Sequence, residues 1–154
     1  MKKILVFLTL FSFAQADNES AKVVYDLTTP KIAKFEKNIL KGIVAHKTYY
    51  QRKFTELEVA VVIHGGAYKY FVKDIQSTKY TKETKLTKKF SALKKRIQSM
   101  NDTYDVHFFM CEIGMKRNGL KQSNIARFVT IVPNSTIALI DKQNEGFAYI
   151  PVGR

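Results

Sequence analysis

The sequence predicts a single α/β domain of three layers, with helices on both faces of a five-stranded, mainly parallel sheet. Short β-branched segments alternate with amphipathic segments of helical spacing, which is the pattern of βαβ units. The 154 residues suffice for one domain with a real core, and 45% of them are hydrophobic. Polar residues follow at least three of the predicted strands, where α/β sheets bind their ligands.

The first βα unit is predicted near the N-terminus. Lys22–Leu27 forms the first strand, and Thr28 and Thr29 then stand before Pro30 as a hydroxyl cap before a proline at the first helical position. Apolar residues recur with helical spacing from there to about Tyr50, and lysines fill the other face. We therefore expect one continuous helix after the first strand.

The second unit begins with Leu57–His64, a β-branched run typical of a parallel strand buried on both faces, which Gly65–Gly66 ends. Ala67–Ile75 is predicted as a short helix or turn, and Gln76–Lys85 as a mobile, lysine-rich loop. A strongly amphipathic helix follows. Its apolar stripe consists of Leu86, Phe90, Leu93, Ile97 and Met100.

The third strand, Val106–Met110, ends at Cys111. Residues 112–118 after it are predicted to form a short helix that stops at Gly119. The cysteine therefore falls where a buried strand passes into the N-terminus of a helix.

Two more strands complete the predicted sheet. Phe128–Val132 forms the fourth strand, and Ser135 is placed to cap a helix that runs to about Gln143. Ile137–Ile140 could instead form a strand. The last strand is Phe147–Ile150, directly before a proline.

Residues 1–16 are predicted to be a secretory signal peptide, separate from the domain at 17–154. A basic start precedes the apolar run Ile4–Phe13, which is too short to span a bilayer, and Ala14-Gln15-Ala16 is an A-x-A cleavage signal. We expect cleavage after Ala16 and a periplasmic location. No later stretch is long enough to span a bilayer, so we expect no stable membrane insertion.

The chain is strongly basic, which bears on its partners. The formal charge is +13, and it becomes +11 when Lys2 and Lys3 leave with the signal peptide, which holds no acidic residue. An exported protein rarely meets nucleic acid, so we expect no nucleic-acid partner. The lysines are spread over helix faces and a loop, as on a solvated surface; contact with anionic lipid or other envelope polyanions is the alternative.

Cys111 is the only cysteine and cannot form a disulfide within its own chain. A helix N-terminus lowers the pKa of a neighbouring thiol, whereas the carboxylate of Glu112 acts in the opposite direction. Two interpretations stay open from the residues alone. Cys111 is either a functional nucleophile or a buried cysteine that packs as a small hydrophobe.

Parallel strands bring their carboxyl ends to one edge of a sheet, so polar residues from separate parts of the chain meet there. His64 could act as a base, orient an anion or simply pack, and Gly65 and Gly66 would let a backbone approach a ligand closely. The candidate binding residues beside Cys111 are His64, Gly65, Gly66, Glu112, Asn134 and Ser135.

Several chemistries find no support in the sequence. No glycine-rich nucleotide-binding pattern occurs, and no G-x-S-x-G elbow of a serine hydrolase occurs. The spacings of His46, His64, His107 and Cys111 match no zinc pattern. We therefore expect neither a cofactor nor a metal.

Four segments in order resemble the DsrE/DsrF-like family of sulfur-relay proteins, over nearly the whole mature chain. They are Val61–Gly66, Cys111 at the end of the third strand, Val129–Pro133 and Gln143–Pro151. The resemblance implies a flavodoxin-like domain with a five-stranded parallel sheet, assembled as a homo-oligomer, a trimer or hexamer. It also implies that Cys111 stands where relay members carry a persulfide and pass sulfane sulfur to a partner protein.

Relay members work in the reducing cytoplasm beside their partners, whereas this chain carries a predicted export signal. We therefore expect a periplasmic protein that binds or transfers sulfane sulfur through Cys111, as a carrier or sulfurtransferase with a sulfur donor or acceptor protein as partner. Two alternatives remain. One is a non-catalytic module of the cell envelope that binds a small molecule or a protein and has a structural cysteine; the other is an oligomeric structural protein of the envelope.

Overall fold

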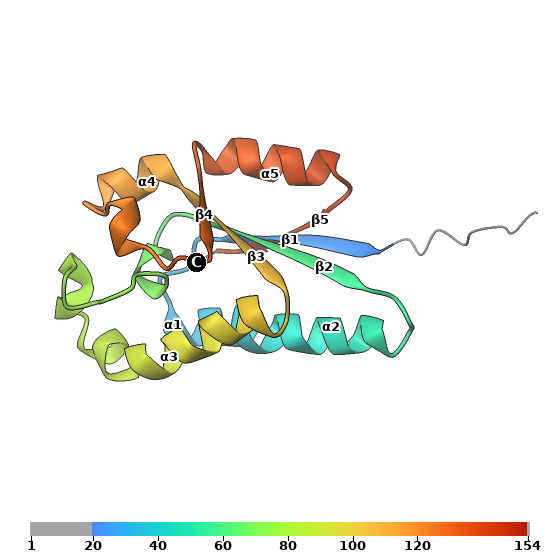
Figure 1. Ribbon diagram of the computed structural model, residues 1–154, viewed down its shortest axis with the longest axis horizontal. Coiled ribbons are helices and arrows are strands. Elements are labelled where there is room, and N and C mark those ends of the chain that lie inside the picture. Colours follow the sequence, from blue (N-terminus) through green and yellow to red (C-terminus); the bar gives the residue numbers. More distant parts are fainter. Residues whose placement is uncertain (1–19, 154) are drawn as a thin grey trace, which may run out of the picture.

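The computed structural model describes residues 20–153, so the predicted signal peptide lies outside the described residues. Five strands form one sheet in the order β4-β3-β2-β1-β5 (Figure 1). Every pair of neighbouring strands is parallel, which confirms the predicted α/β class. The strands are β1 (Ala21–Leu27), β2 (Leu57–Ile63), β3 (Val106–Cys111), β4 (Val129–Val132) and β5 (Ala148–Val152).

Helices lie on both faces of the sheet, as Figure 1 shows. One face is covered by α1 (Ile32–Phe35), α2 (Ile43–Gln51) and α3 (Thr84–Asp102), which build the larger hydrophobic core with it. The opposite face carries α5 (Ser135–Asn144) over a smaller cluster that includes Val24, Val62 and Ala138. The short helix α4 (Glu112–Arg117) follows β3 directly and lies near the start of α5.

The segment after β1 is helical without a break from Ile32 to Gln51, as predicted, but it is not α-helical throughout. A π-helical stretch, Glu36–Gly42, separates α1 from α2, and its wide turn buries both Ile39 and Leu40. The N-cap residue of α1 is Lys31, whose side chain makes no capping hydrogen bond. The predicted threonine cap before Pro30 is therefore wrong, because Thr29 is fully buried and its hydroxyl accepts from the N–H of Lys31 instead.

The segment between β2 and α3 contains two short 3₁₀ helices, Tyr68–Tyr70 and Lys79–Lys82. The second lies inside the stretch predicted to be a mobile loop, and that prediction is corrected. Tyr80 explains why: its ring is buried and its hydroxyl donates to Asn118 just after α4 at 3.1 Å. One buried aromatic side chain thus fixes a segment whose composition is otherwise polar.

The start of α5 also differs from the prediction. Asn134 is the N-cap, and its side chain accepts a hydrogen bond from the N–H of Thr136 at 2.7 Å. Ser135 is the first helical residue and is therefore not needed as the cap. The alternative strand at Ile137–Ile140 does not form, since these residues lie inside α5. In residues 20–153, no helix is both long and apolar enough to cross a membrane.

Candidate functional site

Three neighbouring strands bring ionisable side chains to the carboxyl edge of the sheet. Side chains alternate between the two faces of a strand. Val24, Val62 and Phe109 pack in the small cluster beneath α5, so the residues two positions later point to the same face. Those residues are Asp26, His64 and Cys111. The predicted convergence at this edge is therefore present, on the face that α5 covers.

Cys111 ends β3 and is the N-cap of α4. It also contacts residues from two further segments, α5 and the 3₁₀ helix Tyr68–Tyr70. Burial raises the pKa of its thiol and is the largest single effect. It is outweighed by the N–H groups of Gly114 and Ser135, together with the hydroxyls of Ser135 and Tyr68, so that the pKa of Cys111 is lowered overall. The surroundings thus favour the thiolate.

Tyr68 and Gly114 depend on each other at this site. The hydroxyl of Tyr68 donates to the carbonyl oxygen of Cys111 at 3.0 Å and also faces the sulfur. Burial raises the pKa of Tyr68, so the phenol stays protonated and remains a donor. A Cβ at Gly114 would overlap this hydroxyl. The glycine is what lets the first turn of α4 approach the tyrosine.

The contacts that stabilise the thiolate also enclose it. Cys111 is only 6% exposed, and Met115 in the following helix is buried as well. Only a small reactant can reach such a sulfur without movement of α4 or of the start of α5. The enclosed position is therefore compatible with a persulfide carrier for small sulfur donors, and also with a packed, structural cysteine.

A second group of polar side chains lies at the same edge. His64 Nε2 is 2.5 Å from Asp26 Oδ1, and the hydroxyl of Tyr149 on β5 donates to Asp26 Oδ2 at 2.6 Å. Burial raises the pKa of Asp26, but the hydrogen bonds from His64 and Tyr149 outweigh it and leave the pKa lowered. Asp26 is therefore an anion that holds the imidazole in one orientation.

Of the predicted site residues Glu112, Asn134 and Ser135, only Ser135 hydrogen-bonds to Cys111. Glu112 forms an ion pair with Lys116 one turn later at 2.7 Å, and it is not among the groups that shift the pKa of Cys111. The prediction that the carboxylate of Glu112 raises the pKa of the Cys111 thiol is therefore not supported by the structure. Asn134 acts as the cap of α5, which leaves the N–H and hydroxyl of Ser135 for Cys111.

The close approach that Gly65 and Gly66 allow is to the chain's own loop. Gly65 has a φ of +60°, and a Cβ on it would lie 3.0 Å from the Cβ of Thr28. A Cβ on Gly66 would lie 2.8 Å from the Cβ of Pro30. The two glycines thus pack the turn after β2 against the turn after β1, which positions His64 next to Asp26.

Four residues of the site were not selected from the sequence: Asp26, Tyr68, Gly114 and Tyr149. Asp26 carried a readable signal, because a charged residue near the end of a hydrophobic strand is uncommon in a buried sheet. No sequence pattern marked Tyr68 or Tyr149 as a site residue. Tyr68 lies in a short 3₁₀ helix, and Tyr149 lies on the half-exposed edge strand β5. Their roles come from tertiary contacts alone.

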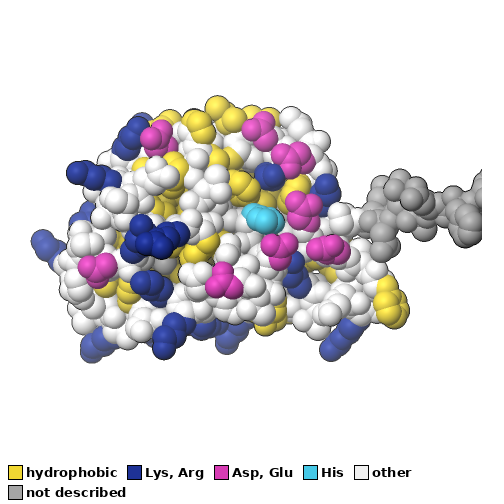
Figure 2. Space-filling model, viewed as in Figure 1, with side chains coloured by type: hydrophobic (Ala, Val, Ile, Leu, Met, Phe, Trp, Pro, Cys, Tyr) yellow, Lys and Arg dark blue, Asp and Glu magenta, His cyan; other side chains and the backbone are white. Residues whose placement is uncertain are grey.

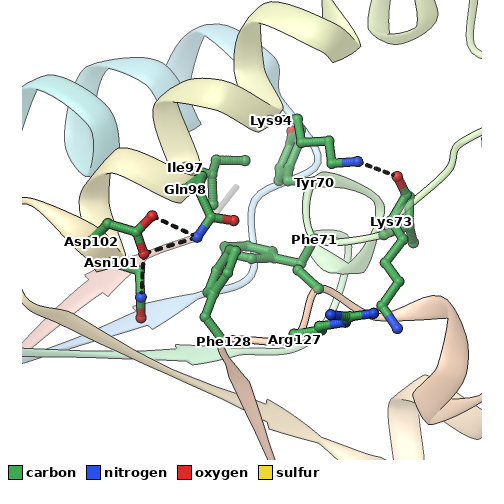
Figure 3. Close-up of a pocket in the computed structure, with 12 residues that line it drawn as sticks. Tyr70, Phe71, Lys73, Lys94, Ile97, Gln98, Asn101, Asp102, Arg127 and Phe128 are labelled. Atoms are coloured by element: carbon green, nitrogen blue, oxygen red, sulfur yellow. Dashed lines mark hydrogen bonds between the residues drawn. The ribbon is translucent and has the colours of Figure 1, made fainter.

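A cavity of about 510 Å³ lies elsewhere, on the α3 face of the sheet (Figure 3). Figure 3 shows three basic side chains on one side of it, amide and acidic side chains on the other, and two phenylalanines between them. These are Lys73, Lys94 and Arg127; Gln98, Asn101 and Asp102; and Phe71 and Phe128. None of the predicted site residues lines this cavity, so it is separate from the carboxyl edge around Cys111.

The surface charge is unevenly distributed. Figure 2 shows acidic side chains gathered on the right-hand half of one face, and most lysine and arginine side chains on the left-hand half and along the lower margin. The carboxyl ends of the strands lie at the left in the same view. This basic end favours the approach of anionic reactants. Within residues 20–153, no three His, Cys, Asp or Glu side chains gather where they could hold a metal ion.

Comparison with known proteins adds a family to this geometry. Residues 7–152 match the DsrE/DsrF-like family. The chain belongs to that family. Its membership indicates a role related to sulfur relay.

Two individual proteins are similar to this chain. An uncharacterized protein of Aquifex aeolicus (strain VF5) is 29% identical over 153 residues, which are 98% of this chain and 64% of that protein. The chain therefore spans less than two thirds of that relative's length. The solved structure of MTH1491, a protein of unknown function from Methanobacterium thermoautotrophicum, has the same fold. Its TM-score is 0.60 at 16% identity, over 86% of this chain and 99% of the other.

The contacts of Ser135 give a direct prediction for the thiol. Ser135→Ala removes a hydroxyl that lowers the pKa of Cys111, so the pKa of the thiol rises in this variant. The measurement is the ultraviolet absorbance of the thiolate against pH, taken as the difference from the same protein with Cys111→Ser so that the absorbance of the eight tyrosines cancels. Ser123→Ala, a change of the same kind at an exposed position of the 3₁₀ helix Gln122–Asn124, serves as the control. An unchanged titration in Ser135→Ala would contradict the placement of this hydroxyl.

Proposed function

We propose that this protein binds or transfers sulfane sulfur through Cys111 and that it does so in the periplasm. The observation that carries the proposal is the set of donors around the sulfur. A thiolate attacks a sulfane sulfur, and the same group must later leave as a thiolate when a second thiol removes that sulfur. N–H groups from two helices and two hydroxyls stabilise this anion in both steps. Family membership supports the same chemistry.

The proposed location rests on the N-terminal sequence, whose basic, apolar and A-x-A regions stand in the order of a signal peptide. An exported protein lacks the cytoplasmic partners of a sulfur relay. Polysulfide and thiosulfate are anionic sulfur compounds that suit the basic end of the molecule (Figure 2). The proposed substrate class is therefore a small anionic sulfur donor, with a thiol as the acceptor.

One observation favours the alternative of a binding module with a structural cysteine. Cys111 is 6% exposed, and buried cysteines are commonly inert packing residues. The two functions differ in whether Cys111 takes up sulfur while the protein stays folded. A carrier takes up sulfur in the folded state, whereas a packed cysteine does so only after the protein unfolds.

The test of the proposal is sulfur loading followed by intact mass spectrometry. Incubation of the folded protein with polysulfide is expected to add the mass of one or more sulfur atoms, which dithiothreitol then removes. Cys111→Ser, the matched control, is expected to gain none. A wild-type protein that stays unmodified while a known sulfur carrier is loaded in parallel would exclude the carrier function.

We also propose that the protein assembles as a homo-oligomer, a trimer or hexamer. Three isoleucines support this, because each is about half exposed to solvent. One lies on α4 and two lie on α5. They are Ile113, Ile137 and Ile140. A second copy of the chain would cover this apolar surface, which includes one end of the cysteine site.

The oligomer is tested by size-exclusion chromatography with light scattering. The double variant Ile137→Glu/Ile140→Glu is expected to be a monomer, because two buried carboxylates in an apolar interface are strongly unfavourable. Tyr49→Glu, which is similarly exposed on α2, is expected to leave the assembly unchanged. A wild-type protein that is monomeric at micromolar concentration would contradict this part of the proposal.

A further inference from the structure

Three side chains from adjacent strands form a hydrogen-bonded chain beside Cys111. Asp26 on β1 contacts the Nε2 of His64 with one carboxylate oxygen and accepts from the hydroxyl of Tyr149 with the other. Both oxygens of Asp26 therefore have a partner. Its side chain is only 16% exposed, so the pair is shielded from water on most sides.

This arrangement fixes which nitrogen of His64 is basic. An anionic Asp26 accepts a hydrogen bond, so the neutral imidazole carries its proton on Nε2 and its lone pair on Nδ1. No group within residues 20–153 has a hydrogen bond to Nδ1. The side chain of His64 is 28% exposed. A basic nitrogen is thus held in place and remains accessible to a ligand.

His64 and Cys111 occupy equivalent positions on neighbouring strands. The last residue pair of the β2–β3 ladder is Ile63 with Met110, and His64 and Cys111 are the next residues along the two strands. Neighbouring strands lie about 4.8 Å apart, and both side chains point to the α5 face. The strand order reverses at β1, where open α/β sheets bind ligands beyond the carboxyl ends of their strands.

We propose that His64 is the general base for the thiol that removes sulfur from Cys111, with Asp26 and Tyr149 as positioning residues that fix its tautomer. This inference rests on the proposed sulfur transfer and names the class of acceptor: an aliphatic thiol that is protonated at neutral pH. Such a thiol is a poor nucleophile until it loses its proton. A positioned base supplies that deprotonation at the moment of attack.

The step balances without an external oxidant or reductant. The proton of the acceptor thiol goes to Nδ1 of His64 as the acceptor sulfur attacks the outer sulfur of the Cys111 hydropersulfide. A new bond forms between these two sulfurs, and the bond between the outer sulfur and Sγ of Cys111 breaks. Cys111 leaves as a thiolate, held by Gly114 and Ser135. The products are the acceptor hydropersulfide, the Cys111 thiolate and a protonated His64, and the sulfane sulfur keeps its oxidation level.

Among the described residues, the ionisable group that contacts His64 is Asp26, and Tyr149 is linked to His64 through Asp26. Cys111 lies at the end of the neighbouring strand β3. The helix packed on this face, α5, carries Asp141 and Lys142 near its other end, where Lys142 pairs with Glu145 at 2.6 Å. The groups that orient His64 therefore lie at the carboxyl edge and not at the far end of α5.

The experiment compares two acceptor thiols on protein that has been loaded with polysulfide. N-acetylcysteine is protonated at neutral pH, whereas 2-nitro-5-thiobenzoate is already ionised and needs no base. For His64→Gln we expect discharge of Cys111 by N-acetylcysteine to be about 100-fold slower than in the wild type, and discharge by the nitrothiobenzoate to be unchanged. The difference with N-acetylcysteine disappears at a pH above the pKa of that thiol. His107→Gln, the same change at an exposed histidine of β3, is the control.

Asp26→Asn tests the tautomer and provides a second variant should His64→Gln fold poorly. Because Tyr149 donates to one side of this group, the new amide places its oxygen toward Tyr149 and its NH₂ toward His64. Nε2 must then accept, and the proton moves to Nδ1, which can no longer act as a base. We expect the same selective loss with N-acetylcysteine. Asp26→Asn/Tyr149→Phe frees the amide to turn over and regains part of the rate.

The outcomes separate this inference from the proposed function. Variants that load sulfur and discharge it to both thiols at wild-type rates would overturn the role of His64 and leave the sulfur carrier standing. Equal slowing with both thiols would show a merely structural effect and would also overturn it. A wild-type protein that takes up no sulfur would remove the proposed function and this step together.

Discussion

The site depends on one structural constraint: the N-termini of α4 and α5 both lie at the sulfur atom of Cys111. Cys111 and Val132 form the last pair of the β3–β4 ladder, so the chain leaves both strands at the same height of the sheet. α4 begins directly after Cys111, and α5 begins after the short turn at Pro133 and Asn134. The N–H groups that face the sulfur therefore come from two helices that parallel pairing forces to start side by side. A change in the register of β4 would remove half of them.

The division of the chain into strands and helices could be predicted because hydrophobic periodicity reflects burial, and burial follows from the layers themselves. The position of Cys111 at the end of β3 followed from the same pattern. The prediction of Ser135 as the cap of α5 is wrong, because Asn134 and Ser135 are equally good capping residues and the sequence does not show that Ser135 contacts the sulfur. Tyr68 and the Asp26–His64 pair depend on contacts across the sheet that no local pattern encodes.

Two different chemical environments lie next to each other at the carboxyl edge of the sheet, one around Cys111 and one around His64. The sulfur is enclosed and stabilised as an anion, while the imidazole of His64 is partly open and oriented by the carboxylate of Asp26, whose side chain is 16% exposed. Enclosure restricts access to the sulfur, so only a small reactant reaches it without movement of α4 or of the start of α5. The larger cavity on the α3 face plays no part in this arrangement, since its lining residues belong to the other side of the sheet.

The most direct test of the account is the rate at which iodoacetamide alkylates Cys111 in the folded protein as the pH is varied. The account predicts that this small reagent reacts without unfolding and that the rate follows a titration centred below the pKa of an ordinary thiol, since the thiolate is the reactive form. Alkylation that proceeds only as fast as the protein unfolds, at every pH, would contradict it. Cys111 would then be a packing residue, and the carboxyl edge would be a scaffold without a nucleophile.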